Sequence, residues 1–169
     1  MPKRDSMEKP DFLSDAEWSY VQEQTASLER IRSDGKADVA DYLANPDGRA
    51  GGKGPSGLPT LLLTTKGRKS GTPRTVALVF LQDGEDMVVV ASLAGYDQHP
   101  AWYLNLQADP KCWVQRDRQR TAAVARVASD VERRDLWPRL NAVLPLWGHF
   151  QSGTDRPFPI VILSPTGDA

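Results

Sequence analysis

The feature that most constrains this chain is a basic, glycine-containing segment, residues 64–74, between two short apolar runs. The runs, residues 61–63 and 76–81, are leucine-rich or β-branched and bounded by Gly and Pro, which is typical of buried strands. Residues 64–74 are therefore predicted to connect one strand to the next. Strands that follow each other through short connections pair antiparallel, so an antiparallel sheet is expected.

The connecting segment carries four cations and no acidic residue: Lys66, Arg68, Lys69 and Arg74. Gly67 and Gly71 allow positive φ and a close approach of the backbone to a ligand, and successive amides in such a turn can bind an anion. Arg presents a planar fork to phosphate or carboxylate, and Lys adds a point charge. From these residues alone, an anion site and a solvated basic turn are equal alternatives. The phosphate loop of nucleotide hydrolases is excluded, because the required Gly-Lys-Ser/Thr spacing is absent.

Composition limits the class of protein. A chain of 169 residues with 40% hydrophobic and 25% charged residues is expected to form one soluble domain. The net charge of −1 argues against a nucleic-acid binder. The single cysteine, Cys112, excludes an internal disulfide and favours a cytoplasmic location. No apolar run reaches transmembrane length and the N-terminus has no apolar signal core.

Residues 1–57 are predicted to form a tail, helices and a linker ahead of the main domain, residues 58–165. Ser14 and Glu17 match a capping box that opens a helix ending near Gly35. Its apolar stripe is Trp18, Val21, Leu28 and Ile31. The stripe is expected to dock on the domain, and peripheral contact with a membrane surface is the open alternative. A short helix at 39–43 and a Gly- and Pro-rich connector at 46–59 are expected next.

The remaining pattern predicts about six mostly antiparallel strands with peripheral helices, an α+β barrel. A turn is expected at 83–86, an irregular segment at 142–158, and helices at 101–108 and from a capping box at Ser129 to about Asn141. Further strands are expected at 87–92, 111–115, 119–127 and 160–163.

A second candidate site lies where the strand ending at Ser92 approaches the helix that begins at Pro100. Free amides and the positive end of the helix dipole would face one spot there, and Ser92 could add a hydroxyl. Trp102 is predicted to pack in the core, whereas Tyr103 and Asn105 could be structural or face a ligand. No metal-ligand cluster, nucleophile elbow or histidine triad is visible. His99 and His149 are expected at the surface or at caps, Cys112 in the core, and Arg156 in a local contact with Asp155. Such a chain suits an enzyme whose cofactor carries the reactivity.

The motif at 61–74, together with residues 89–92, 100–106 and 154–157, resembles the deazaflavin-dependent nitroreductase family. The resemblance covers about residues 58–165. It implies a split β-barrel of the flavin-reductase type, and it implies coenzyme F420, a deazaflavin whose tail carries a phosphodiester and glutamates. The activity it implies is hydride transfer to a quinone, a nitroaromatic compound or another activated hydrophobic acceptor.

The resemblance also implies roles for residues. Arg68, Lys69 and Ser70 would hold the phosphate end, and Ser92 would help protonate the acceptor. The deazaflavin would lie against Arg74, Thr75, Val76, Ala77, Leu78, Val79, Val90, Ala91, Ser92, Leu93, Ala101, Trp102, Tyr103, Leu104, Asn105 and Trp147. Leu144, Trp147 and Phe150 would line the acceptor pocket.

The chain departs from the family pattern at several of these positions. Leu93 stands where many members carry Lys, and His99 where Asn commonly precedes Pro. The acceptor-pocket positions carry Leu144, Trp147 and Phe150 where several tyrosines are common. Leu and Phe cannot donate a hydrogen bond, so an apolar acceptor pocket is expected. Two alternatives remain: a related oxidoreductase that binds FMN or FAD, and a non-catalytic deazaflavin-binding protein. Neither a nucleic acid nor a metal is expected as a partner, and the oligomeric state is left open.

Overall fold

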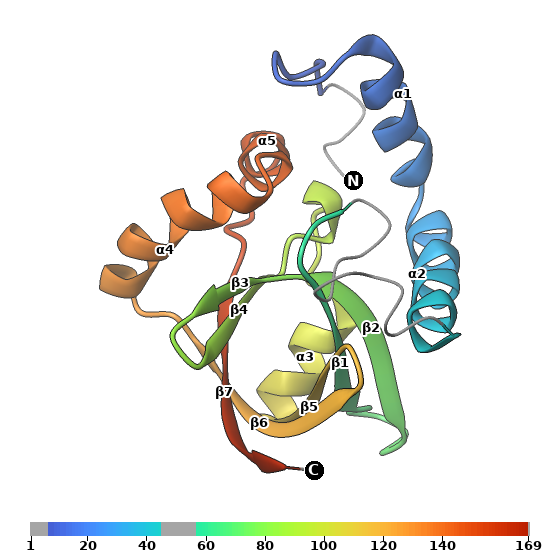
Figure 1. The fold of residues 1–169 in the computed structure, drawn as a ribbon. Helices are drawn as coiled ribbons and strands as arrows, with labels where there is room; N and C mark the ends of the chain where they lie inside the picture. Colours follow the sequence, from blue (N-terminus) through green and yellow to red (C-terminus); the bar gives the residue numbers. More distant parts are fainter. Residues whose placement is uncertain (1–6, 45–56, 169) are drawn as a thin grey trace.

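A computed structural model describes residues 7–44 and 57–168 of the chain. Its main element is one antiparallel sheet of seven strands in the order β2-β1-β5-β6-β7-β4-β3. The strands are β1 (Thr60–Lys66), β2 (Pro73–Val79), β3 (Leu81–Asp83), β4 (Asp86–Val90), β5 (Lys111–Arg116), β6 (Gln119–Val127) and β7 (Ile160–Asp168). The sheet curls around helix α3 (Ala101–Ala108), which lies inside the curl in Figure 1. The predicted α+β split barrel is confirmed, with one strand more than expected.

The extra strand arises because the apolar run at 76–81 is divided. β2 pairs with β1 along its whole length, whereas β3 pairs with β4. Phe80 lies between them, is buried, and donates its backbone N–H to the carbonyl of Pro59 over 3.1 Å. The prediction of a single strand over 76–81 was wrong. At Phe80 the chain passes from β2, at one edge of the sheet, to β3, at the other edge. The residues on both sides of Phe80 are apolar, so the sequence pattern does not reveal the bend.

Alternate residues of the central strands fill two cores. Leu61, Leu63, Val89 and Val161 point into the barrel around α3, together with Trp102 and Leu106 of that helix. Val88, Val90, Ile160 and Ile162 point outward and are covered by α4 (Asp130–Val143) and α5 (Leu146–Ser152). Because β4 and β7 are buried on both faces, their sequences are continuous apolar runs instead of an alternating pattern.

The N-terminal segment forms two helices, α1 (Asp15–Gln24) and α2 (Leu28–Ala44). The capping box at Ser14 is confirmed. The predicted helix end at Gly35 is wrong, because α2 continues through it and includes the short helix expected at 39–43. Burial of Tyr42 anchors α2: its hydroxyl donates to the carbonyl of Thr60 (3.3 Å) and accepts from the N–H of Asp117 (2.9 Å). Most of the connector predicted at 46–59 lies outside the described residues.

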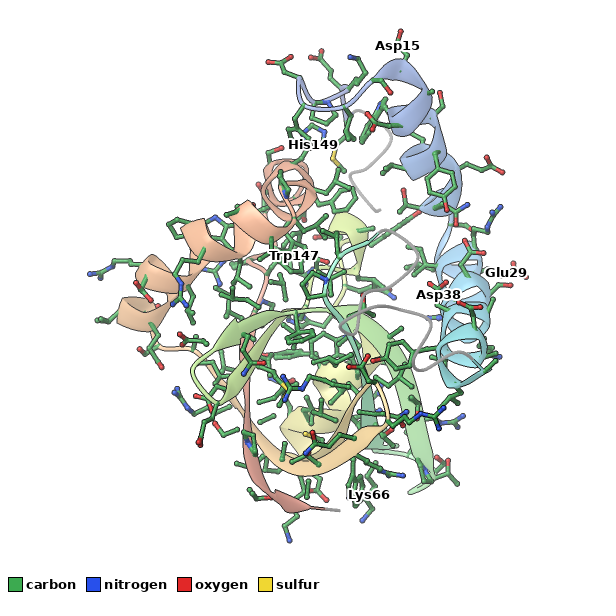
Figure 2. All side chains as sticks on the ribbon, in the orientation of Figure 1. Asp15, Glu29, Asp38, Lys66, Trp147 and His149 are labelled. Carbon is green, nitrogen blue, oxygen red and sulfur yellow. The ribbon has the colours of Figure 1, made fainter. Side chains whose placement is uncertain are left out.

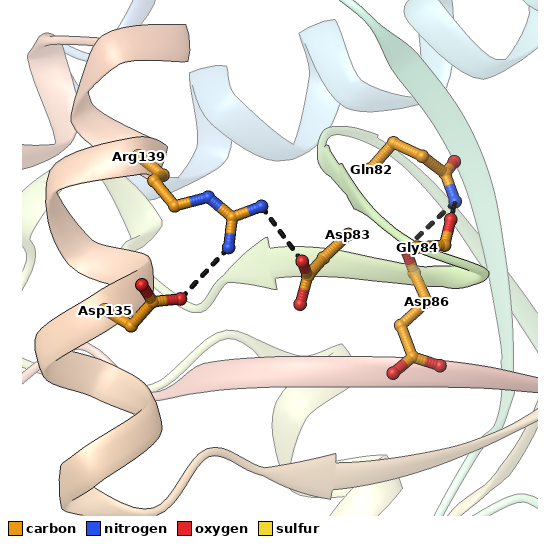
Figure 3. A network of polar contacts seen from close by, with 6 residues as sticks. All are labelled: Gln82, Asp83, Gly84, Asp86, Asp135 and Arg139. Atoms are coloured by element: carbon orange, nitrogen blue, oxygen red, sulfur yellow. Dashed lines mark hydrogen bonds and ion pairs between the residues drawn. The ribbon is translucent and has the colours of Figure 1, made fainter.

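Helix α4 begins at the predicted capping box on Ser129. Figure 3 shows how α4 is tied to the β3–β4 hairpin: the guanidinium of Arg139 contacts Asp83 at 2.9 Å and Asp135 at 3.0 Å. In the same hairpin, the Gln82 side chain donates to the carbonyls of Gly84 and Asp86. Helix α5 occupies a segment expected to be irregular. It is short and contains Gly148, so burial of Trp147 and Phe150 stabilises it more than its own helix propensity does.

Candidate functional site

The basic segment forms a compact turn between β1 and β2. The predicted connection at 64–74 is shorter than expected, since β1 continues to Lys66 and β2 begins at Pro73. The N–H of Gly67 donates to the carbonyl of Thr72, and the N–H of Gly71 donates to that of Gly67, both over 2.8 Å. Gly71 has φ of 72°, which favours glycine. A side chain at position 67 would meet the Ser70 hydroxyl at 2.7 Å, so the turn is tightly packed.

The cations of this turn are exposed and have no anionic partner among residues 7–44 and 57–168. Arg68, Lys69 and Arg74 are exposed, and none of them forms an ion pair with another residue in the described part of the chain. Ser70 supports the turn itself, because its hydroxyl contacts the Thr72 hydroxyl at 2.7 Å and accepts the Thr72 N–H. Unpaired cations gathered on one rigid turn fit an anionic group such as a phosphodiester.

Asn105 of α3 holds this turn from inside the barrel. Its buried side-chain oxygen accepts both the backbone N–H of Arg68 (3.2 Å) and one guanidinium N–H of Arg68 (3.0 Å). Its amide nitrogen donates to the hydroxyl of Thr65 over 3.1 Å. The oxygen and the nitrogen of the Asn105 side-chain amide thus both form hydrogen bonds within the chain. Its predicted contact with the cofactor stays a prediction, and its observed role is to position Arg68.

Strand β2 leads from the basic turn toward α5. Val76 and Leu78 are half-buried and pack against the barrel core, and their predicted contact with the cofactor stays a prediction. Thr75, Ala77 and Val79 alternate onto the opposite face. In Figure 2 Lys66, at the end of β1 beside the turn, lies at the opposite end of the barrel from Trp147. At about 3.3 Å per residue, a strand of this length spans roughly 20 Å, which suits an elongated ligand.

At the far end, β4 is followed by a short loop with unusual backbone angles. Ser92 has right-handed φ and ψ of −86° and −38°, whereas Leu93 and Ala94 have positive φ of 44° and 52°. Gly95 is also left-handed, and a Cβ there would lie 2.9 Å from the carbonyl oxygen of Phe150 in α5. A right-handed residue followed by a left-handed one turns successive N–H groups toward one side, as in an anion-binding nest. Non-glycine residues adopt such angles only when the surroundings enforce them.

Arg156 binds this loop through three hydrogen bonds, whereas the sequence predicted for it only a local contact with Asp155. Its guanidinium donates to the carbonyls of Ala91 (3.0 Å), Ser92 (2.6 Å) and Tyr96 (3.0 Å). The guanidinium carbon also lies 4.9 Å from the ring centroid of Phe158. Arg156 and the loop are about sixty residues apart in the chain, so no local spacing in the sequence signals the contact.

His99 completes this cluster. Its Nδ1 lies 3.2 Å from Nη1 of Arg156. Because a guanidinium can only donate, Nδ1 accepts and the neutral ring carries its proton on Nε2. Burial, reinforced by the charge of Arg156, lowers the pKa of His99 below its usual 6.5. The ring also packs on Tyr103, with centroids 4.8 Å apart. Pro100 is the N-cap of α3, not its first residue as predicted.

The predicted acceptor residues come together beside the loop. Trp147 and Phe150 are buried in the outer core, and Leu144 is half-buried against it. Ser92 is half-buried at the end of β4. His149, on the same helix, instead contacts the N-terminal segment: its Nε2 lies 2.8 Å from the carbonyl of Glu8, and its ring packs edge-on against Trp18. The predicted ligand contacts of Ala101, Trp102, Tyr103 and Leu104 stay predictions.

Other ligand classes find little support in the described part of the chain. Cys112 is buried, and burial raises the pKa of its thiol to about 12, so it is not a nucleophile. No group of three or more His, Cys, Asp or Glu side chains is placed to hold a metal ion among residues 7–44 and 57–168. Within the same ranges, the helices are too short or too polar for any of them to span a bilayer.

The fold and the site define a flavin-reductase-like split β-barrel with a cationic turn at one end and a buried apolar cluster, which includes Trp147 and Phe150, at the other. Residues 36–165 match the model of the F420H(2)-dependent quinone reductase family. A protein of Mycobacterium tuberculosis named F420H(2)-dependent quinone reductase is 35% identical over 121 residues, which cover 70% of this chain and 81% of that protein. The chain therefore belongs to the F420H(2)-dependent quinone reductase family.

Two solved structures share this fold. One is described as an F420-H2 dependent reductase; it is 34% identical, with a TM-score of 0.59, and the match covers 63% of this chain and 94% of that one. The other is described as a domain-swapped dimer; it is 32% identical, with a TM-score of 0.60, and the match covers 89% of this chain and all of that one (100%). The family resemblance predicted from residues 58–165 is confirmed.

Proposed function

We propose that this protein is an oxidoreductase that passes a hydride from reduced coenzyme F420 to a quinone-like acceptor. The observation that carries the proposal is the compact turn of exposed cations, which form no ion pair with the described residues, at one end of a strand whose other end meets the apolar cluster around Trp147 and Phe150. Membership of the quinone reductase family supports the same cofactor. The reduced deazaflavin, when bound, supplies two electrons and a proton as hydride, and the quinone takes up one further proton to become the quinol.

The chain's own contribution is binding and orientation. Arg68 and Lys69 would pair with the phosphodiester of the cofactor tail, and Ser70 would keep the turn in shape for it. The ring system would lie along β2, toward the loop at Ser92 and Leu93. The Nδ1 of His99, the histidine beside the loop, is engaged by Arg156, which lowers the pKa of the ring together with its burial. Protein side chains therefore position the reactants, in keeping with cofactor-based chemistry.

The acceptor pocket is proposed to be apolar. Trp147 and Phe150 are buried and Leu144 is partly buried, and of the three only the Trp ring N–H can donate a hydrogen bond. Such a pocket favours flat, hydrophobic quinones over acceptors that need several donors, such as nitroaromatic compounds. The half-buried hydroxyl of Ser92 is the proposed donor to the reduced acceptor oxygen.

The direct test mixes the purified protein with reduced F420 and menadione and follows the return of oxidised-cofactor absorbance. A rate well above the protein-free reaction is expected. If several quinones of different tail length all fail to raise the rate, the reductase assignment fails.

A titration separates the remaining alternatives. The basic turn predicts that F420 binds more tightly than FMN or FAD, because only F420 carries both a phosphodiester and a glutamate tail. Preferential retention of FMN or FAD would support a flavin enzyme instead. Tight F420 binding without any acceptor-dependent oxidation would indicate a storage protein.

The proposal includes where in the cell the protein acts and whether it contacts a membrane. A cytoplasmic location agrees with the single, buried Cys112. Quinones with long tails reside in membranes, so contact of the N-terminal helices with a membrane surface stays a proposal. Co-sedimentation of the protein with lipid vesicles, compared with a variant lacking residues 1–27, would test it.

A further inference from the structure

The Arg156 guanidinium is bound to one short stretch of backbone through all three of its nitrogen atoms. Nε donates to Tyr96, Nη1 to Ala91 and Nη2 to Ser92, over 2.6–3.0 Å. No acidic side chain pairs with it at ion-pair distance in the part of the chain that the structure describes. Its direct contacts are therefore backbone carbonyl groups, and the Asp97 carboxylate acts on its charge only from beyond ion-pair distance.

Two of these carbonyls belong to the peptide groups that carry the N–H groups of Ser92 and Leu93. The carbonyl of Ala91 shares a peptide group with the N–H of Ser92, and the carbonyl of Ser92 shares one with the N–H of Leu93. Neither N–H donates to an acceptor among the described residues. A donor on the oxygen of a peptide group polarises its N–H, because hydrogen bonds in a chain strengthen one another.

The backbone angles aim these two amides in one direction. Ser92 is right-handed and Leu93 left-handed, the combination that forms an anion-binding concavity. The strain of the left-handed Leu93 and Ala94 must be offset by surrounding contacts. Those contacts are the three bonds to Arg156, the packing of Gly95 on Phe150, and the bond from the Tyr96 hydroxyl to the carbonyl of Thr25 over 2.8 Å.

We propose that Arg156 is a positioning residue that shapes the Ala91–Tyr96 loop and directs positive charge, through two peptide groups, to the amides of Ser92 and Leu93. These amides then stabilise negative charge on the deazaflavin ring or on the acceptor oxygen. The side chain of Leu93 is apolar, so the charge reaches the site through the backbone. This inference rests on the proposed cofactor, and its test is chosen to separate the two.

Arg133 provides a matched control. Its Nη1 donates to the carbonyl of Phe158 over 2.6 Å, and its guanidinium stacks on Trp137 at 5.3 Å. Like Arg156 it is an arginine that binds backbone and an aromatic ring, but it has no contact with the Ala91–Tyr96 loop. Arg133→Gln therefore removes the same kinds of contact in smaller number, one backbone hydrogen bond against three, and only Arg156→Gln removes charge behind the loop.

The first measurement needs no cofactor. Amide hydrogen exchange is followed at Gly95 and Tyr96, whose N–H groups donate to the carbonyls of Ser92 and Leu93 within the loop. Arg156→Gln is expected to accelerate exchange at both amides by about tenfold or more, the loss expected for charged hydrogen bonds. Arg133→Gln is expected to leave both unchanged. Equal exchange in wild type and Arg156→Gln would overturn the positioning role.

The second measurement compares the Kd of F420 with that of the deazaflavin riboside, which lacks the phosphodiester tail. Arg156→Gln is expected to weaken both ligands by about tenfold and to leave their ratio unchanged, since the ring loses contacts and the tail does not. Arg156→Lys, which keeps the charge, is expected to recover part of the affinity. Arg133→Gln is expected to bind both within about twofold of wild type.

Each outcome decides a different claim. Equal losses in Arg156→Gln and Arg133→Gln would show a general structural role and overturn the inference. If Arg156→Gln does not fold, Arg156→Lys takes its place in both measurements. A lysine cannot bond all three carbonyls at once. Exchange rates and Kd values equal to those of wild type in Arg156→Lys would therefore show that the three hydrogen bonds are not needed, and would overturn the inference. If wild type binds neither deazaflavin, the proposed function fails, whereas the exchange measurement still decides whether Arg156 shapes the loop.

Discussion

At the residue scale, Arg68 and Asn105 show what a sequence can and cannot reveal. The cations of the turn are visible from the sequence, because charge and glycine content are local properties of residues 64–74. Asn105 lies 37 positions from Arg68, and only the folded barrel brings its amide against the turn. Reading the residues left Asn105 either structural or ligand-facing. The structure shows that its amide oxygen and nitrogen are both bonded inside the protein.

A thermodynamic cycle tests whether Asn105 acts through Arg68. Arg68→Ala is expected to weaken F420 binding about tenfold, the loss of one charged hydrogen bond. Asn105→Ala is expected to weaken it less, because the guanidinium remains but is no longer held. In the Arg68→Ala background, Asn105→Ala should cost less than it does in wild type, because only its bonds to the backbone N–H of residue 68 and to Thr65 are then left to lose. Lys69→Ala is the control, since Lys69 has no bond to Asn105 and its effect should add to that of Asn105→Ala. Additive losses for Arg68 and Asn105 would disprove the coupling.

His99 gives a prediction about pH. Its pKa in the folded protein is lowered from 6.5 by burial and by Arg156, so below pH 6.5 the unfolded state binds more protons than the folded state. Stability is therefore expected to fall as pH decreases through 6.5 and toward the lowered pKa. His99→Gln, which can accept the same hydrogen bond without titrating, should lack this component. Urea unfolding of both proteins at several pH values measures it, and parallel pH profiles would contradict the contact with Arg156.

At the scale of elements, local chemistry explains the successes. Both capping boxes, at Ser14 and Ser129, start helices where the sequence places them, and the turn at Gly84 joins two strands as expected. The failures are elements whose existence depends on tertiary packing. Helix α5 is stabilised by burying Trp147 and Phe150, and α2 continues through Gly35 to Ala44, where the buried Tyr42 anchors it. Such packing leaves no local signal.

The capping box of α4 makes a prediction about acid. Hydrogen bonds from Arg126 and then from the Ser129 backbone lower the pKa of Glu132 to about 2 from 4.5. A carboxylate with a lowered pKa stabilises the fold above its unfolded value and loses that contribution as pH falls from 4.5 toward about 2. Glu132→Gln should therefore melt at a lower temperature than wild type at neutral pH, and the difference should vanish near pH 2. A difference in Tm that is constant over this range would contradict the assignment.

At the scale of the whole molecule, the sheet order could not be read from the sequence. Hairpins were predictable because their strands are neighbours in the chain, whereas the pairing of β1 with β5 and of β4 with β7 crosses about fifty and seventy residues. Strand patterns alone predicted only an α+β barrel, and the family resemblance specified the split β-barrel. The resemblance did not predict how α2 is attached to the barrel, which depends on Tyr42.

Tyr42→Phe tests that attachment. The substitution leaves the carbonyl of Thr60 and the N–H of Asp117 without the hydroxyl that joins them to α2. The expected loss in the free energy of unfolding is about 1–3 kcal/mol, the cost of unsatisfied buried groups. Tyr20→Phe is the control, because Tyr20 is 63% exposed and its change should stay within about 0.5 kcal/mol. Equal stability of the two variants would show that α2 is held by packing alone.

The central claim is that the basic turn binds the acidic tail of a redox cofactor whose ring lies at the other end of β2. Calorimetric titration of wild type and of an Arg68→Ala/Lys69→Ala variant with F420 and with the tail-less deazaflavin riboside tests it most directly. Wild type is expected to prefer F420 by about tenfold or more, and the variant should lose this preference while keeping its affinity for the riboside. A variant that keeps the full preference for F420 would contradict the account.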